Sequence, residues 1–450
     1  MATRKEQGLK TPLYEMLRLW GRFLIDGIYY RKNLRIGKER VPADGTPLLV
    51  VSNHQNCLND AFLVQTLMAD RKLHFIARAD AFTISPVLRR ILVWSGVLPA
   101  FRMKYEGIDA LENNEQTFRL SEQRLLQGRS LLIFPEAGHQ DKHWLGRFSL
   151  GYVRLAFEAA AAGAYKKDIR ILPVCNHYSS YFGMRNDALV RVGTPISLQP
   201  YYEEYQSRPR TVQREINRQV REQIEAMMLN ISDLEHYDDI DFLRTSSFGE
   251  DFARRLGKDP ARLPEKLEAD RELVRRLSSL EEEAFTAVHA YRDALREAKV
   301  PDRQLAAPPS WLRLIGRLLL LLVTLPLAVV SLWPALPAWY IPRHFSRRSP
   351  DPMLEGTFLL AFNVLLIQPL AMLLTFAVTG LLLGWGIGLV HALLLPFLCI
   401  VAWDWFALAR RSRADFRFAY LSPRARKRLE RLRSTAFGRA GKALEPDQDE

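Results

Sequence analysis

Short apolar runs alternate with stretches of helical periodicity between about residues 33 and 200. Runs that are apolar throughout are typical of strands buried on both faces, as in a parallel sheet that helices cover on both sides. The alternation therefore predicts an α/β domain with a largely parallel sheet flanked by helices. The predicted strands are 48–52, 73–77, 97–101, 130–135, 169–175 and 188–193, and the predicted helices lie near 60–69, 86–95, 111–127 and 148–162.

Amphipathic helical patterns flank this region on both sides. Apolar residues recur at helical spacing between Leu13 and Ile28, which indicates a helix that lies in a membrane interface or packs on the domain. Charged residues interrupt this stretch and no small-residue cleavage site follows, so we expect no signal peptide and a cytosolic N-terminal region. Residues 203–300 are charged and poor in glycine, and two apolar stripes predict a pair of helices packed on the main domain or on each other. The first stripe contains Val212, Ile216, Val220, Ile224, Met227 and Ile231, and the second contains Leu267, Leu273, Leu277, Leu280, Val288, Tyr291 and Leu295.

Two long apolar runs without a charged residue, 318–342 and 356–403, are typical of membrane-embedded segments. Prolines interrupt the first run and are expected to break a simple spanning helix. Arginines follow both runs, and their preference for the cytosolic side favours hairpins over three plain spans. We therefore predict a re-entrant hairpin at about 313–342 and a two-helix hairpin at about 357–405 that turns near 380–388.

The net charge of +13 suits a chain that binds either a nucleic acid or an anionic membrane surface. Its distribution favours the membrane, because twelve basic and two acidic residues lie between Arg410 and Lys442, directly after the second apolar run. A basic tail at this place is expected to bind anionic headgroups. No zinc-finger spacing or RNA-recognition signature accompanies the charge, so we expect no nucleic-acid partner. Cys57, Cys175 and Cys399 are far apart and predict neither a disulfide framework nor a metal site.

Together these patterns divide the chain into five segments. Each boundary between segments lies where the apolar periodicity or the charge of the sequence changes. The segments are an N-terminal amphipathic helix (1–32), an α/β domain (33–202), a charged helical region with a linker (203–310), membrane hairpins (311–408) and a basic cytosolic tail (409–450).

Candidate chemistry begins with the stretch VSNHQNCLND at residues 51–60. His54 follows a predicted strand and Asp60 lies at the start of the next helix, so the two side chains can meet across one turn. Imidazole takes up a proton near neutral pH, and a carboxylate that fixes its tautomer makes it a better general base. No G-x-S-x-G elbow occurs, and Cys57 is more simply a buried thiol than a nucleophile. A His–Asp pair without a side-chain nucleophile suits a donor that is already activated, such as a thioester.

Three further stretches accompany this one: GVLPAFR at 96–102, LLIFPEAGH at 131–139 and ILPVCNHY at 171–178. In this order the four blocks resemble those of the glycerolipid acyltransferases, which include the lysophosphatidate (1-acyl-glycerol-3-phosphate) acyltransferases and relatives that use glycerol-3-phosphate. In that family the second block ends in an arginine for the substrate phosphate, the third shapes the acceptor site, and the fourth is an apolar strand with a proline. The resemblance covers roughly residues 15–200. It implies catalytic roles for His54 and Asp60 and substrate-binding roles for Arg102, Glu136 and Gly138.

Two positions depart from the family's pattern. The family usually has four residues between the histidine and the aspartate, whereas five lie between His54 and Asp60, and Asn59 occupies the place of the usual aspartate. An asparagine can orient an imidazole but cannot neutralise its cation, and some relatives have the longer spacing, so we assign the acid to Asp60. Ala137 replaces the first glycine of the third block, where it either tightens the acceptor site or has no effect.

The resemblance implies a membrane-bound O-acyltransferase of phospholipid synthesis. It would move a fatty acyl group from acyl-CoA or acyl carrier protein to a glycerol-phosphate lipid, with 1-acyl-glycerol-3-phosphate as the leading acceptor and glycerol-3-phosphate or another lysophospholipid as the alternative. It implies no cofactor, anionic membrane lipids as partners, and a catalytic domain at the cytosolic face of a membrane, the inner or plasma membrane in a bacterium.

Two other classes remain as alternatives. An inactive lipid-binding or scaffold protein on the same fold would be expected to have lost His54, Asp60 or Arg102. A metal-dependent hydrolase built on His54, Asp60 and Glu136 lacks a second cluster of ligands in the sequence.

Overall fold

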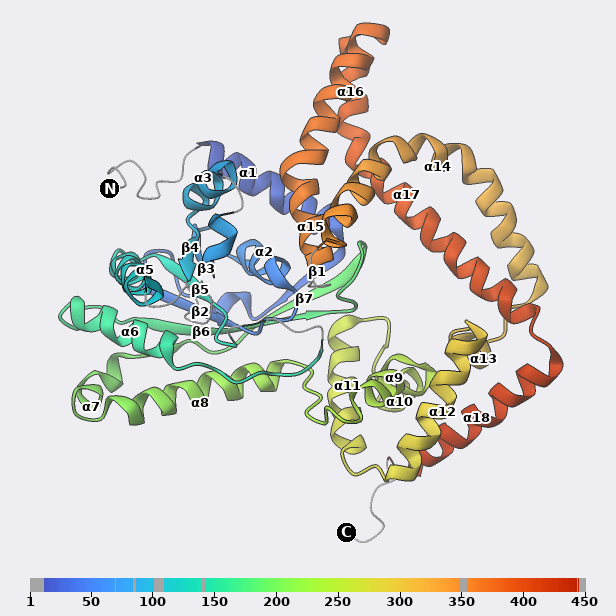
Figure 1. Ribbon diagram of the computed structural model, residues 1–450, viewed down its shortest axis with the longest axis horizontal. Helices are drawn as coiled ribbons and strands as arrows, with labels where there is room; N and C mark the ends of the chain where they lie inside the picture. The colour runs from blue at the N-terminus through green and yellow to red at the C-terminus, as the bar shows by residue number, and fades with distance from the viewer. Residues whose placement is uncertain are drawn as a thin grey trace. The chain divides into compact units, whose positions relative to one another are not determined.

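The chain folds into two compact units. The first contains Met1–Met228 and Ser346–Leu360, and the second contains Leu229–Phe345 and Ala361–Glu450. The first unit holds the sheet, drawn mostly from blue to green in Figure 1, and the second is helical. The computed structural model describes residues 12–68, 70–83, 86–100, 109–136, 138, 142–348, 354–442 and 444.

The first unit is built on an eight-stranded sheet with the order β1-β7-β6-β2-β5-β3-β4, in which β8 also pairs with β6. Among the described strands, only the β6–β7 and β6–β8 pairs are antiparallel. The predicted fold class, a largely parallel sheet flanked by helices, is therefore confirmed. The strands are β1 (Tyr30–Ile36), β2 (Leu48–Ser52), β3 (Leu73–Arg78), β4 (Leu98–Ala100), β5 (Ser130–Ile133), β6 (Arg170–Tyr178), β7 (Asn186–Val192) and β8 (Ile196–Ser197).

Apolar residues of the sheet, of α6 (Gly151–Ala162) and of α8 (Pro209–Met227) form the core of this unit. Val212, Ile216, Val220 and Ile224 are at most 2% exposed, so the first apolar stripe of the charged region packs on the α/β unit. The other helices of the unit include α1 (Pro12–Phe23), α2 (Cys57–Leu67), α3 (Pro86–Ser95), α5 (Asp109–Leu126) and α7 (Tyr202–Ser207).

The strand β6 continues through Pro173, although a proline removes one donor from a sheet ladder. Arg170 and Ile171 pair with β8, whereas residues from Val174 onward pair with β7. Pro173 therefore lies where the antiparallel neighbour changes, and its carbonyl accepts a hydrogen bond from Gly193 N at 2.8 Å. β6 can thus extend to Tyr178, past Val174, which pairs with Ser52 at the end of β2.

The C-terminal basic segment differs from the predicted tail. Residues 409–419 are the end of α17, and α18 (Pro423–Lys442) packs on α12 (Glu282–Ala298) within the second unit. The ring of Phe437 contacts those of Phe248 and Tyr291, with centroids 5.2 and 5.6 Å apart. The sequence pattern hid this packing because few apolar residues lie among the arginines. The remaining helices of this bundle are α9 (Tyr237–Thr245), α10 (Ser247–Arg255), α11 (Leu263–Leu277) and α13 (Arg303–Ala306).

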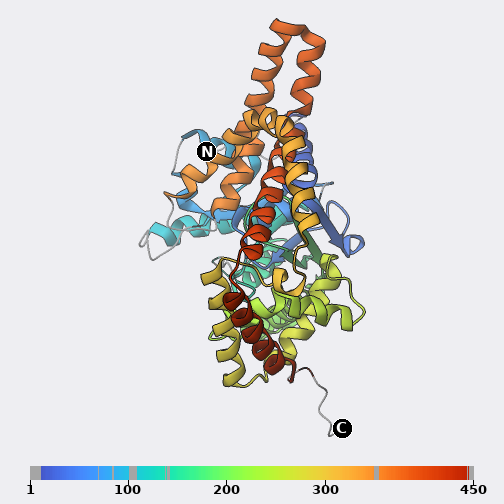
Figure 2. The same cartoon turned by 90° about the vertical axis from the view of Figure 1, so that its right-hand side faces the viewer.

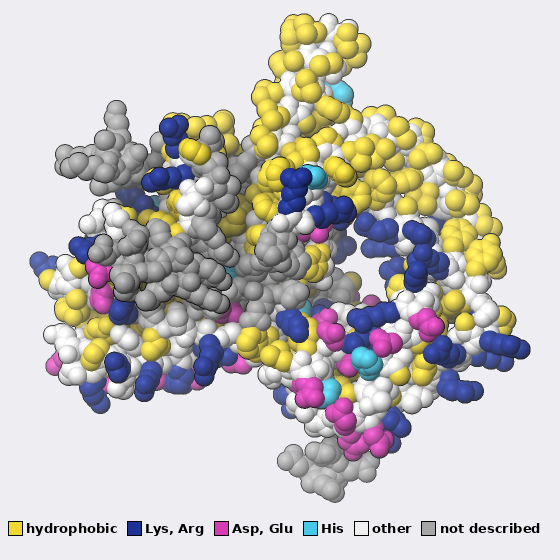
Figure 3. All heavy atoms as spheres, in the orientation of Figure 1, with side chains coloured by type: hydrophobic (Ala, Val, Ile, Leu, Met, Phe, Trp, Pro, Cys, Tyr) yellow, Lys and Arg dark blue, Asp and Glu magenta, His cyan; other side chains and the backbone are white. Residues whose placement is uncertain are grey.

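The first apolar run forms one helix, α14 (Trp311–Ser346), so the predicted re-entrant hairpin at 313–342 is wrong. Four prolines lie inside it, and each removes only one hydrogen bond of the helix. The helix therefore curves, as Figure 1 shows, without ending. By length and composition α14 can cross a membrane, and hydrophobic side chains cover much of its surface in Figure 3.

The second apolar run forms the predicted hairpin. α15 (Leu354–Phe362), a π-helical turn (Asn363–Ile367) and α16 (Gln368–Leu383) follow one another, and α17 (Trp385–Ala419) returns. The turn is at Gly384, whose φ of +100° favours glycine. Figures 1 and 2 show α16 and α17 side by side. By length and composition, α17 is also able to span a membrane.

Candidate active site

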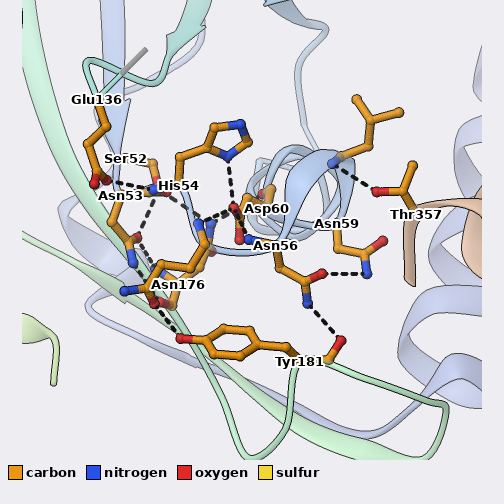
Figure 4. A network of polar contacts seen from close by, with 12 residues as sticks. Ser52, Asn53, His54, Asn56, Asn59, Asp60, Glu136, Asn176, Tyr181 and Thr357 are labelled. Atoms are coloured by element: carbon orange, nitrogen blue, oxygen red, sulfur yellow. Dashed lines mark hydrogen bonds and ion pairs between the residues drawn. The ribbon is translucent and has the colours of Figure 1, made fainter. Parts of the chain in front are cut away.

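His54 and Asp60 meet at the carboxyl end of β2 (Figure 4). β2 ends at Ser52 and α2 begins at Cys57, and the turn between them carries the imidazole toward the first turn of α2. His54 Nδ1 lies 2.9 Å from Asp60 Oδ2. Because a carboxylate only accepts hydrogen bonds, Nδ1 carries the proton of the neutral imidazole, and Nε2 then carries its lone pair. The two residues are thus in contact, in the tautomer that a general base requires.

Asp60 is fully buried and accepts four hydrogen bonds. Oδ2 accepts from His54 Nδ1 and, at 2.8 Å each, from the backbone N–H groups of Gln55 and Asn56. Oδ1 accepts from the Tyr178 hydroxyl at 2.5 Å. Burial, and then the charge of Asp60, raise the pKa of Tyr178 well above 10, so this phenol remains a donor. Donors on both oxygens fix the carboxylate in one orientation, and with it the ring of His54.

The turn between His54 and Asp60 closes through a residue with left-handed backbone. Cys57 has a φ of 46°, which costs a non-glycine residue on the order of 1 kcal/mol. Its thiol is buried, as the sequence predicts. Asn59 is fully buried and donates to Asn56 Oδ1 at 3.3 Å, so it faces away from the imidazole.

Glu136 joins the loop after β5 to the turn after β2. Its Oε1 accepts a hydrogen bond from His54 N at 2.9 Å, and its Oε2 accepts one from Gly146 N at 2.8 Å. Burial raises the pKa of Glu136, although the two backbone donors act in the opposite direction. The ring of Phe134, two residues earlier, stacks on His54 with the centroids 4.1 Å apart. Glu136 therefore holds the backbone beside the imidazole, and its substrate-binding role stays a prediction.

The other two predicted substrate residues are Arg102 and Gly138. Arg102, assigned to the substrate phosphate, lies outside the described residues. Among the residues that the structure describes, none has an atom within 4 Å of a Cβ built on Gly138. The roles of both residues stay predictions.

Sequence reasoning missed two sets of supporting residues. Tyr178 is the last residue of the fourth block. Its partner Asp60 is 118 positions away, so the sequence around Tyr178 does not predict the contact. The second set lies beside the pair: the Tyr181 hydroxyl is 2.9 Å from both Gln55 Oε1 and His143 Nδ1. Since Gln55 Nε2 donates to Lys142 O, its Oε1 accepts from Tyr181, and Tyr181 in turn accepts from His143.

The arrangement supports proton transfer by the imidazole. A half-buried imidazole, 17% exposed, is backed by a fully buried carboxylate, which is the geometry of a general base. Within the described ranges, no group of three or more His, Cys, Asp or Glu side chains is placed to hold a metal ion.

The comparisons with known proteins agree with the four blocks. Residues 34–177 match the sequence model of the Acyltransferase family. They form an acyltransferase domain. The resemblance to the glycerolipid acyltransferases is thereby confirmed.

Two curated relatives of this acyltransferase domain are chloroplastic 1-acyl-sn-glycerol-3-phosphate acyltransferases. That of Arabidopsis thaliana is 29% identical over 148 residues, which cover 32% of this chain and 36% of the relative. That of Brassica napus is 28% identical over 148 residues, with 32% and 37% covered. The match thus spans little more than a third of either relative.

A solved structure is also similar to the chain. It is the 1-acyl-sn-glycerophosphate acyltransferase of Thermotoga maritima, with 18% identity and a TM-score of 0.34, covering 46% of this chain and 78% of that one. The helical second unit lies outside the residues that match the family.

Proposed function

We propose that the protein transfers a fatty acyl group from an acyl thioester to a hydroxyl of a glycerol-phosphate lipid, with 1-acyl-glycerol-3-phosphate as acceptor. The observation that carries the proposal is the contact of 2.9 Å between His54 Nδ1 and the buried carboxylate of Asp60, inside an acyltransferase domain. The names of the two curated relatives support the choice of acceptor.

In this reaction His54 Nε2 takes the proton of the acceptor hydroxyl as its oxygen attacks the thioester carbonyl. The bond from carbon to sulfur breaks in the resulting intermediate, and the proton on His54 passes to the leaving thiolate. Asp60 stabilises the imidazolium between these steps. General-base catalysis of this kind accelerates a reaction by about 10²–10⁴-fold. Arg102 would bind the acceptor phosphate through two parallel hydrogen bonds.

The acceptor would reach the site from a lipid bilayer. α1 leaves Leu13, Met16, Leu19 and Phe23 between 40 and 58% exposed along one side, which suits a helix lying in a membrane interface. Two long apolar helices in the second unit support membrane attachment as well. We propose that the enzyme acts at the cytosolic face of a membrane, with acyl-CoA or acyl carrier protein as the soluble donor and no cofactor.

The test uses the full chain in detergent with acyl-CoA and a panel of acceptors, and it measures free thiol. The panel contains 1-acyl-glycerol-3-phosphate, glycerol-3-phosphate, a lysophosphatidylcholine and a monoacylglycerol without phosphate. We expect turnover with the first acceptor, unchanged by a chelator and lost in His54→Ala, which should stay folded and lipid-bound. Turnover by His54→Ala would refute the mechanism, and equal use of the phosphate-free acceptor would refute the role of Arg102.

A further inference from the structure

Residues 354–360, the beginning of α15, belong to the first unit and contact the turn that carries the His–Asp pair. Thr357 is 3% exposed, and its Oγ1 accepts a hydrogen bond from Leu58 N at 3.2 Å, as Figure 4 shows. Leu58 is the second residue of α2, where a backbone N–H has no partner inside its own helix. The N-cap residue Asn56 makes no side-chain capping bond. Thr357 thus supplies an acceptor that the local sequence does not.

Gly356 allows the close approach of α15 to this turn. A Cβ atom built on Gly356 would lie 3.0 Å from Asn59 Nδ2 and 3.4 Å from Asn56 Oδ1. The first distance is tighter than most real Cβ contacts, so a side chain here would push the two segments apart. The Tyr29 hydroxyl also donates to Gly356 O at 3.2 Å, which ties the same residue to the chain before β1.

These contacts fall on the residues directly before Asp60. Leu58 and Asn59 precede it on α2, and the backbone amides of Gln55 and Asn56 hold its carboxylate. A shift of this turn would therefore move the carboxylate relative to the imidazole. Asn59, which occupies the place of the family's usual aspartate, is the residue that a Cβ atom on Gly356 would approach most closely.

We propose that Thr357 and Gly356 are positioning residues for the His54–Asp60 pair. The segment that leads into the apolar hairpin holds the first turn of α2 in its active arrangement, and the longer His–Asp spacing is matched to this support. Both residues act through α2 and lie outside the region that matches the family. The inference rests on the acyl transfer proposed above.

Thr357→Val tests the proposal, because valine keeps the size of threonine and removes the acceptor. Loss of one orienting hydrogen bond should lower kcat about 3- to 10-fold, with the KM for the acceptor within about twofold of the wild type. Thr357→Ser should restore kcat to within about twofold, since serine keeps the acceptor oxygen. Thr324→Val, in α14, is the matched control, because that hydroxyl donates to Leu320 O within its own helix, and the kcat of this variant should equal that of the wild type. An unchanged kcat in Thr357→Val, or no rescue by serine, would overturn the proposal.

Gly356→Ala gives a second, steric test. It should lower kcat without raising the KM for the acceptor, because the added methyl displaces Asn59 and not the substrate. Gly386→Ala is the control, since a Cβ atom built on Gly386 meets nothing within 4 Å. Equal kcat in the two variants would contradict the packing argument.

Amide hydrogen exchange of the peptide containing residues 54–60 gives a readout that does not depend on turnover. The amides of Gln55, Asn56 and Leu58 are those that bind Asp60 and Thr357, so Thr357→Val should raise their exchange rates and Thr324→Val should not. If the wild type transfers no acyl group, the proposed function fails while this measurement still decides the positioning role. Unchanged exchange in Thr357→Val would overturn that role in either case.

Discussion

The hydroxyl of Tyr178 donates to Oδ1 of Asp60 at 2.5 Å, so the last residue of β6 holds the acid that orients His54. β6 lies next to β2 in the sheet, and the end of each strand contributes to the same carboxylate: β6 supplies Tyr178, and the turn after β2 supplies two backbone amides. The pair is therefore fixed by the sheet as well as by its own turn.

Tyr178→Phe should lower kcat about tenfold and leave the KM for the acceptor unchanged, because a hydrogen bond to a charged group is worth about 1.5–3 kcal/mol. The loss should depend on the charge of Asp60. In an Asp60→Asn background the same substitution should cost less than about threefold, which a double-mutant cycle of kcat values measures. A full tenfold loss of kcat in that background would mean that Tyr178 does not act through the carboxylate of Asp60.

The position of the acid is tested by exchanging Asn59 and Asp60. Asp60→Asn should lower the rate of acyl transfer by about 10²-fold or more, because an amide cannot stabilise the imidazolium. The double variant Asn59→Asp, Asp60→Asn should not recover, because the side chain of residue 59 faces Asn56. Free-thiol release by the three proteins gives the answer, and recovery in the double variant would move the acid to residue 59.

Because of His74 on β3, we expect low pH to destabilise the first unit. Burial, and then the charge of Arg124, lower the pKa of His74 from 6.5 to about 3. The unfolded chain therefore binds a proton below pH 6.5 that the folded chain does not bind until about pH 3. The free energy of unfolding should fall through this window by up to about 1.4 kcal/mol per pH unit. Denaturant midpoints of the wild type and His74→Gln, measured between pH 7 and pH 4.5, should show a smaller slope in the variant, and equal slopes would contradict the assignment.

Arg433 should be needed for stability, because it joins α18 to the buried carboxylate of Asp302. Arg433 Nε donates to Asp302 Oδ1 at 3.2 Å, and another guanidinium nitrogen donates to Ser247 Oγ at 2.9 Å. Arg433→Ala should cost about 1–3 kcal/mol of folding free energy, lowering the thermal midpoint of the full chain. Arg431→Ala, at an exposed position of the same helix, is the control. Equal thermal midpoints of the two variants would show that the contacts of Arg433 do not stabilise the fold.

Much of the first unit was predictable because apolar runs mark buried strands. All six predicted strands are present, and β2 has the predicted bounds. β1 was missed because it lies at the sheet edge and has polar residues such as Arg31, Lys32 and Asn33. β8 was missed because a strand of two residues is too short to show an apolar pattern.

The site was predictable where its residues share a turn or follow neighbouring strands. The sequence places His54 and Asp60 within one turn, and Glu136 follows the strand next to β2, so all three meet. Tyr178 and Thr357 were not predictable, because their contacts join residues 118 and 299 positions apart. For α14, the prolines were read as breaks, although a helix continues through them when the neighbouring turns remain bonded.

The left-handed Cys57 affects how related chains are recognised. Here five residues lie between the histidine and the aspartate, Cys57 among them has a left-handed backbone, and the acid still contacts the ring. A search pattern with a fixed interval of four would select Asn59 and class such a chain as a degenerate pseudoenzyme. Homologues with the longer interval should instead be sorted by whether a carboxylate follows that asparagine.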